Sequence, residues 1–86
     1  MNDDHIILGI HVTNRLKEAV DVQRVFTEYG CNIKTRVGLH DVDEHSCSGS
    51  GIVLIEFFGS DADAAAMADK LNAVDGVHVQ KMVFGH

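Results

Sequence analysis

Histidine is frequent in this chain and supplies its clearest candidates for metal chemistry, with six histidines among 86 residues. His11 and His78 fall in two strand-like segments that are expected to pair as antiparallel neighbours. In the simplest symmetric register His11 lies opposite His78, and His5 lies near Phe84. Cross-strand partners have Cβ atoms about 5 Å apart, so the two imidazoles could hold a transition metal with further ligands from a partner chain. The alternative is that they are ordinary histidines facing solvent or an interface.

A second set of potential metal ligands lies in and beside the polar segment 41–51. Its members carry imidazole, carboxylate or thiol groups, and they are His40, Asp41, Asp43, Glu44, His45 and Cys47. A metal site requires a rigid spacing that matches a coordination geometry, whereas this glycine-containing segment matches no standard motif. We interpret it as a solvated hairpin, and whether it has a function stays open.

The third candidate is Thr13-Asn14-Arg15, which lies between the first strand and the first helix. The free N–H groups of a helix N-terminus can bind a carboxylate or phosphate, so these residues are a predicted ligand-binding loop. The same residues can simply cap the helix, with a side-chain oxygen of Thr13 or Asn14 accepting a backbone N–H. Every helix needs such a cap, and both interpretations stay open.

Several activities need motifs that this sequence lacks. A soft-metal chaperone needs a Cys-x-x-Cys motif, an RNA-binding sheet needs an aromatic segment of the Lys/Arg-Gly-Phe type on its third strand, and a phosphatase-type anion site needs a glycine-rich cradle around Arg15. None of these is present. No Ser/His/Asp or Cys/His nucleophile can be placed either, so the chain is not expected to be an enzyme.

Charge and hydropathy limit the partners. The net charge is -6, with thirteen acidic and seven basic residues, and phosphate contacts need clustered lysine and arginine. We therefore expect no direct binding to nucleic acid. No apolar run is long enough to span a bilayer, and the acidic first residues differ from a basic signal peptide. These features predict a cytoplasmic protein with reduced thiols and no membrane partner.

Four segments have the length and periodicity of strands, at residues 5–12, 31–40, 52–58 and 77–84. In the first, alternation directs Ile6, Leu8, Ile10 and Val12 inward. In the second, it predicts inward Cys31, Ile33, Thr35, Val37 and Leu39, and outward Asn32, Lys34, Arg36 and His40. The third is apolar on both faces, which is typical of a central strand.

Two segments have the periodicity of amphipathic helices. The first covers about 15–29 and ends before Gly30, and its predicted core face consists of Ala19, Val22, Phe26 and Tyr29, flanked by Leu16 and Val25. The second begins at a capping box, Ser60-Asp-Ala-Asp63. Its predicted core side consists of Ala64, Met67, Ala68, Leu71 and Val74, and Gly76 is expected to end it.

The order strand–helix–strand–strand–helix–strand predicts an α+β, ferredoxin-like βαββαβ sandwich, because crossovers are right-handed. The antiparallel sheet has the order 4-1-3-2, with both helices on one face. We expect one domain over residues 1–86, with its core at about 5–84. Ile7, Met82 and Phe84, with either Ile52 and Leu54 or Val53 and Ile55, lie on the face without helices. Such an exposed apolar patch predicts self-association.

Short motifs distributed along the chain resemble a known family. Gly30-Cys-Asn-Ile33 resembles the entry to the second strand of ACT regulatory domains. Three further stretches resemble the iron-only hydrogenase system regulators, which are short, stand-alone ACT-like proteins; they are Arg36-Val-Gly38, Ile52-Val-Leu-Ile55 and Leu71-Asn-Ala-Val-Asp-Gly-Val77. The resemblance implies an oligomeric ACT-like fold and a regulatory role. It also implies similarity to the metal-sensing domain of nickel-responsive repressors.

The sequence departs from that family pattern at the ligand sites. Amino-acid-binding ACT domains carry Asp-x-Pro-Gly after the first strand, whereas this chain has Thr13-Asn-Arg-Leu16. The histidines and cysteine of the nickel sensors cannot be matched residue by residue. The hypothesis is therefore a non-enzymatic regulator or sensor that acts as a homo-oligomer, a dimer or tetramer, with a small-molecule or metal effector. The alternatives are a transition-metal sensor that uses surface histidines and an assembly subunit without a ligand.

Overall fold

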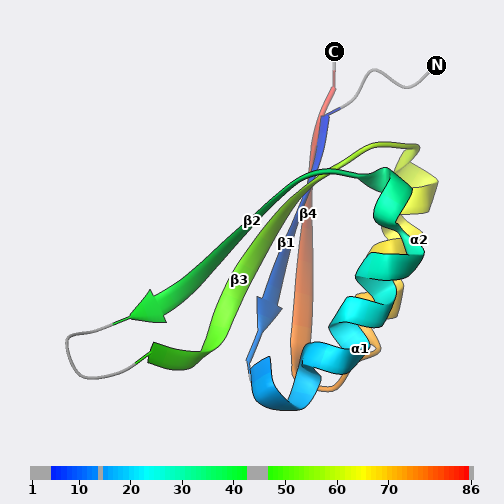
Figure 1. Cartoon of the computed structure of the whole chain (residues 1–86). Coiled ribbons are helices and arrows are strands. Elements are labelled where there is room, and N and C mark those ends of the chain that lie inside the picture. The colour runs from blue at the N-terminus through cyan, green and yellow to red at the C-terminus, as the bar shows by residue number, and fades with distance from the viewer. Residues whose placement is uncertain (1–4, 14, 43–46, 86) are drawn as a thin grey trace.

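The computed structural model describes the backbone of residues 5–13, 15–42 and 47–85. It also describes the side chains of these residues, except those of residues 15–17 and 39–50. The elements in chain order are β1 (His5–Val12), α1 (Arg15–Glu28), the 3-10 turn η1 (Gly30–Asn32), β2 (Ile33–Val42), β3 (Cys47–Phe57), α2 (Asp61–Asn72) and β4 (Val77–Phe84). The strands form an antiparallel sheet of order β2-β3-β1-β4, and both helices cover one of its faces (Figure 1). This confirms the predicted ferredoxin-like α+β fold and its strand order.

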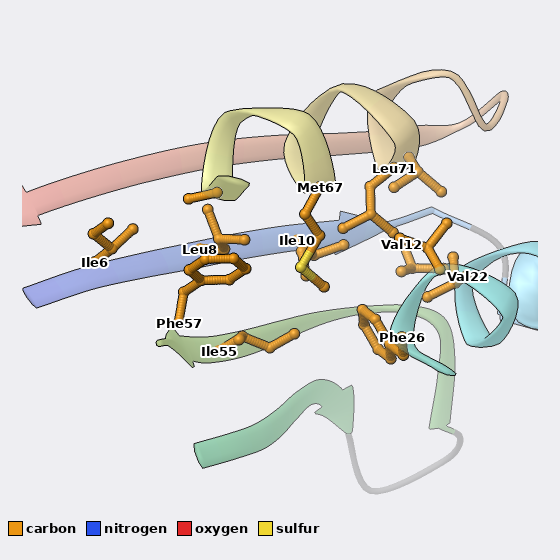
Figure 2. Packing of buried hydrophobic residues seen from close by; sticks show 13 residues of the cluster. Ile6, Leu8, Ile10, Val12, Val22, Phe26, Ile55, Phe57, Met67 and Leu71 are labelled. Carbon is orange, nitrogen blue, oxygen red and sulfur yellow. The ribbon is translucent and has the colours of Figure 1, made fainter. Parts of the chain in front are cut away.

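The core lies between this face of the sheet and the helices, and strict alternation in β1 builds its floor. Ile6, Leu8 and Ile10 are completely buried, as the sequence predicts. They pack against side chains of both helices and β3 (Figure 2), which include Val22, Val25, Phe26, Ile55, Phe57, Ala64, Met67 and Leu71. Full burial of one such aliphatic side chain stabilises the fold by about 1.5–3 kcal/mol, so this cluster supplies most of the driving force.

A β-bulge in β2 overturns the predicted alternation of that strand. Ile33 pairs with Phe57 and Thr35 pairs with Glu56, so one extra residue, Lys34, lies between consecutive pairs. An extra residue reverses the direction of every later side chain.

Beyond the bulge, the inward assignment of Thr35 and Val37 and the outward assignment of Arg36 are therefore wrong. Arg36 pairs with Ile55 on the helix side, and Val37 pairs with Leu54 on the other side. Cys31 was also misplaced, because it lies exposed in η1 rather than in the strand.

The buried stripe of α1 also differs from the prediction. Ala19 is exposed, and Glu18 is buried with 4% of its surface accessible. Glu18, Val22, Val25 and Phe26 follow the i, i+4, i+7, i+8 spacing of one helical face. The apolar pattern alone favours Ala19, because a buried carboxyl group is rare without a polar partner.

The helix ends follow ordinary capping chemistry. Ser60 caps α2, since its Oγ accepts a hydrogen bond from the Asp63 backbone N–H at 3.0 Å, as predicted. The helix ends at Asn72, before Gly76, which adopts a positive φ of 85° in the connection to β4. Neither helix in the described part of the chain has the length and apolar character needed to cross a membrane.

Candidate functional site

The second face of the sheet carries no helix in the described structure and contains the predicted histidine pair. We call it the helix-free face. It consists of the side chains that alternate with the core residues, namely His5, Ile7, Gly9 and His11 of β1, Thr35 and Val37 of β2, Ile52, Leu54 and Glu56 of β3, and His78, Gln80, Met82 and Phe84 of β4. Of the two alternatives left by the sequence, Ile52 and Leu54 lie on this face, because Ile55 is buried in the core.

Large apolar side chains are exposed on this face. The accessible fraction is 45% for Val37, 41% for Ile52, 50% for Met82 and 54% for Phe84. They come from β2, β3 and β4, so they span the whole width of the sheet. Val37 belongs to this set because of the bulge in β2. A sheet face of this composition is typical of an interaction surface.

A shallow hollow of about 370 Å³ lies on the helix-free face. Its lining comes from the three strands β1, β3 and β4, and consists of Gly9, His11, Ile52, Leu54, His78, Gln80 and Met82. Gly9 leaves part of the floor open. A Cβ at this position would lie 3.7 Å from Leu54 Cδ2 and 3.9 Å from the Gln80 carbonyl oxygen, which are ordinary contacts. The strand therefore does not require glycine here for steric reasons.

The predicted pairing of His11 with His78 is confirmed, as is that of His5 with Phe84. The two imidazole rings lie 6.3 Å apart between centroids and are inclined by 40°. Both side chains are exposed at one end of the hollow. No group of three or more potential metal ligands occurs among the described residues. A metal held by this pair therefore needs further ligands beyond the described residues.

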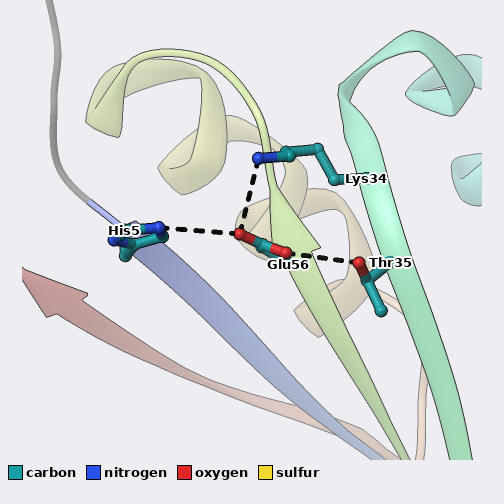
Figure 3. A network of polar contacts seen from close by, with 4 residues as sticks. All are labelled: His5, Lys34, Thr35 and Glu56. Carbon is teal, nitrogen blue, oxygen red and sulfur yellow. Dashed lines mark hydrogen bonds and ion pairs between the residues drawn. The ribbon is translucent and has the colours of Figure 1, made fainter.

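A polar cluster lies at the other end of the helix-free face, beside Met82 and Phe84 (Figure 3). The Glu56 carboxylate accepts a hydrogen bond from the Thr35 hydroxyl at 3.2 Å and lies 3.6 Å from Lys34 Nζ and 3.8 Å from His5 Nε2. The bulge places Lys34 and Thr35 beside the same carboxylate. Sequence reasoning missed this cluster because it assigned Lys34 and Thr35 to opposite faces.

Thr13, in the loop that the sequence predicts to bind a ligand, makes polar contacts. The Thr13 hydroxyl donates to the Gly76 carbonyl oxygen at 2.7 Å, and its oxygen lies 3.2 Å from Glu18 Oε2. These contacts join the start of α1 to the α2–β4 connection. Asn14 and the side chain of Arg15 lie outside the described residues. The adjacent carboxyl group of Glu18 is an unfavourable neighbour for a bound anion, and ligand binding by this loop stays a prediction.

The side chains of the candidate metal ligands at 40–47 lie outside the described part of the structure. The described structure follows the backbone at His40, Asp41 and Cys47, and residues 43–46 lie outside it.

Comparison with known proteins shows similarity of fold. No family model and no curated protein matches the chain. Among solved structures, the uncharacterized protein TM1266 from Thermotoga maritima is 24% identical, over 94% of this chain and 98% of that chain, with a TM-score of 0.79. A formyltetrahydrofolate deformylase from Pseudomonas putida is 20% identical over 91% of this chain, with a TM-score of 0.54, but the match spans 28% of the deformylase. These neighbours agree with an ACT-like, ferredoxin-type fold.

Proposed function

We propose that this chain is a non-enzymatic ACT-like regulatory protein that acts as a homo-oligomer, a dimer or tetramer, whose copies meet across the helix-free face. The observation that carries the proposal is the set of exposed apolar side chains on that face, Val37, Ile52, Met82 and Phe84. Removing apolar surface from water contributes about 25 cal/mol per Å². A second copy of the same face is a suitable cover, because a two-fold interface brings a patch against itself.

The distribution of polar groups on the face supports this form of association. Polar groups alternate with the apolar ones across the sheet, since Ile52 lies in one row with His11 and His78, and Met82 lies in another row with Ile7 and Glu56. A mixture of apolar contacts and polar groups is ordinary for a protein interface. Lys34 and Glu56 also offer both signs of charge at this surface, so they can pair with a symmetry-related copy.

The test compares charged substitutions on two surfaces. Ile52→Glu with Met82→Glu places two carboxylates in the interface, whereas Val20→Glu places one on α1 at a position that is 71% exposed. Sedimentation velocity should show the double variant as a monomer and Val20→Glu as an oligomer of the original size. Far-UV circular dichroism should show an unchanged fold for both. A double variant that remains fully oligomeric would overturn the proposed interface.

The regulatory part of the proposal places the protein in an iron-only hydrogenase system and rests on the motif resemblance, which includes Arg36-Val-Gly38 and Ile52-Val-Leu-Ile55. The proposal expects that deleting the gene, in a cell that makes such a hydrogenase, changes the abundance of hydrogenase transcripts. Complementation with the intact chain should restore the original abundance. Unchanged transcripts and unchanged hydrogen evolution in the deletion strain would contradict this role.

Transition-metal sensing is a second candidate function, favoured by the His11/His78 pair at 6.3 Å. Imidazole nitrogens suit Ni, Co and Zn, and two facing copies would bring four imidazoles together. A metal that binds only the folded oligomer raises its melting temperature. We expect such a rise with one of these metals, and its loss in His11→Asn/His78→Asn but not in the control His5→Asn. No rise with any metal would leave the assembly role without metal sensing.

A further inference from the structure

A second, smaller hollow lies on the helix side of the sheet. It encloses about 160 Å³ between α1 and the strands β2 and β3, and its lining is mostly apolar. Small residues on both sides contribute to it, with Ala19 on α1 and Gly38 and Gly51 on the strands. A Cβ at Gly38 would meet no atom of the described residues within 4 Å, which leaves space beside this glycine.

Among the described residues that line this hollow, Arg36 provides the one positive charge. The bulge in β2 turns Arg36 to the helix side, where its guanidinium carbon lies 4.6 Å from the ring centroid of Phe26. Phe26 belongs to the core cluster shown in Figure 2. The Arg36 side chain is exposed and forms no ion pair with an acidic side chain of the described residues. A guanidinium held over an aromatic ring keeps N–H donors for a carboxylate.

We propose that this hollow binds a small apolar monocarboxylate. The carboxylate pairs with the Arg36 guanidinium, for which a two-pronged hydrogen bond is the favoured geometry. The apolar body of the ligand lies against Val22, Phe26 and Ala19. A cavity of about 150 Å³ accommodates benzene, so the hollow suits a body of about six carbon atoms, branched or aromatic.

The lining also predicts which ligands are rejected. No aspartate or glutamate lines the hollow among the described residues, and Gln23 is the other polar side chain there. The ammonium group of an amino acid would lose water without gaining a charged partner, which is costly. Simple carboxylates should therefore bind better than amino acids of the same shape. Ile52 lines this hollow as well as the one on the helix-free face. Arg36 and Phe26 lie on the helix side, across the sheet from Met82, so the inference does not depend on self-association.

The test uses 4-methylpentanoate and benzoate as probes, with leucine, which is 4-methylpentanoate with an added ammonium group, as the zwitterionic comparison. Amide chemical shifts of the ¹⁵N-labelled chain should move at Gln23, Gly38 and Gly51 on titration with either probe. Leucine should cause much smaller changes at the same concentration. Equal binding of leucine and 4-methylpentanoate would overturn the assigned ligand class, and no shift at these amides with either probe would overturn the site.

Two variants connect binding to the named contacts. Arg36→Gln should weaken binding by about tenfold or more, which is the usual loss on removing a hydrogen bond to a charged group. The matched control is Arg24→Gln, since Arg24 is an exposed arginine on α1 that lies 3.4 Å from Asp21. Gly38→Val should obstruct the hollow and weaken binding too. Undiminished binding by Arg36→Gln would refute the carboxylate contact, and equal losses in both arginine variants would reduce it to a general charge effect.

Discussion

The two faces of the sheet use the same strands but end in opposite environments. On the helix side, Leu8 and Ile10 of β1 are completely buried under α1 and α2. On the helix-free face, Met82 of the neighbouring β4 remains half exposed, and so does Phe84. Two helices can cover one face of a four-stranded sheet, so the apolar residues of the other face need a different cover. This difference separates the residues that fold the chain from those available for association.

The largest expected effect comes from the covered face. Leu8→Ala should lower the free energy of unfolding by about 2–5 kcal/mol, because it removes buried methyl groups and leaves a cavity. Urea denaturation at several protein concentrations measures this loss, which should be the same at each. For Met82→Ala, the loss should grow with concentration, since in the proposed oligomer the contacts it removes lie between copies. Equal, concentration-independent losses at both positions would erase the distinction between the faces.

The next effect concerns Gly76, beyond the C-terminal end of α2. Its φ of 85° is unfavourable for other residues, and a Cβ there would lie 2.0 Å from Glu18 Oε2. Gly76→Ala should therefore lower the free energy of unfolding by about 1–3 kcal/mol. Glu18→Ala removes the clash but not the backbone strain. In a chain that already carries Glu18→Ala, Gly76→Ala should therefore lower the free energy of unfolding by less than it does in the unmodified chain, but not by zero. An unchanged free energy of unfolding in Gly76→Ala would contradict this packing.

Gly9 on the helix-free face should respond in the opposite direction. Its Cβ would make only ordinary contacts at 3.7 and 3.9 Å, and glycine within a strand costs about 0.5–1 kcal/mol relative to alanine. Gly9→Ala should therefore raise the stability by about that amount, as measured by the urea midpoint. A lower urea midpoint for Gly9→Ala would contradict this expectation, because it would mean that the hollow has no space for a methyl group beside Gly9.

The smallest effect lies between the helices, away from both faces. The Lys70 ammonium hydrogen-bonds to the Glu28 carboxylate, and this contact raises the pKa of Lys70 above its ordinary value of 10.5. A raised pKa in the folded state gives stability that is fully present below pH 10.5 and is lost as the pH rises through the folded pKa. The melting temperature of Glu28→Gln should therefore lie slightly below that of the unmodified chain at neutral pH. That difference should vanish at higher pH.

The sequence predicts β1, its inward residues and the pairing of His11 with His78, because strict alternation and antiparallel symmetry leave little choice. It does not predict the bulge at Lys34, since one inserted residue changes no local propensity and yet reverses Thr35, Arg36 and Val37. The hollow beside Arg36 depends on that reversal, whereas the hollow beside His11 and His78 contains no residue of β2. The burial of Glu18 was equally hidden, because its partner Thr13 and its close neighbour Gly76 come from other segments.

The most direct measurement of the central claim is sedimentation equilibrium of the unmodified chain over a wide range of concentrations. The account predicts a mass of two or four times the 9.4 kDa chain, with dissociation at low concentration. A mass of 9.4 kDa at every concentration would contradict it, because the apolar helix-free face would then remain open to water.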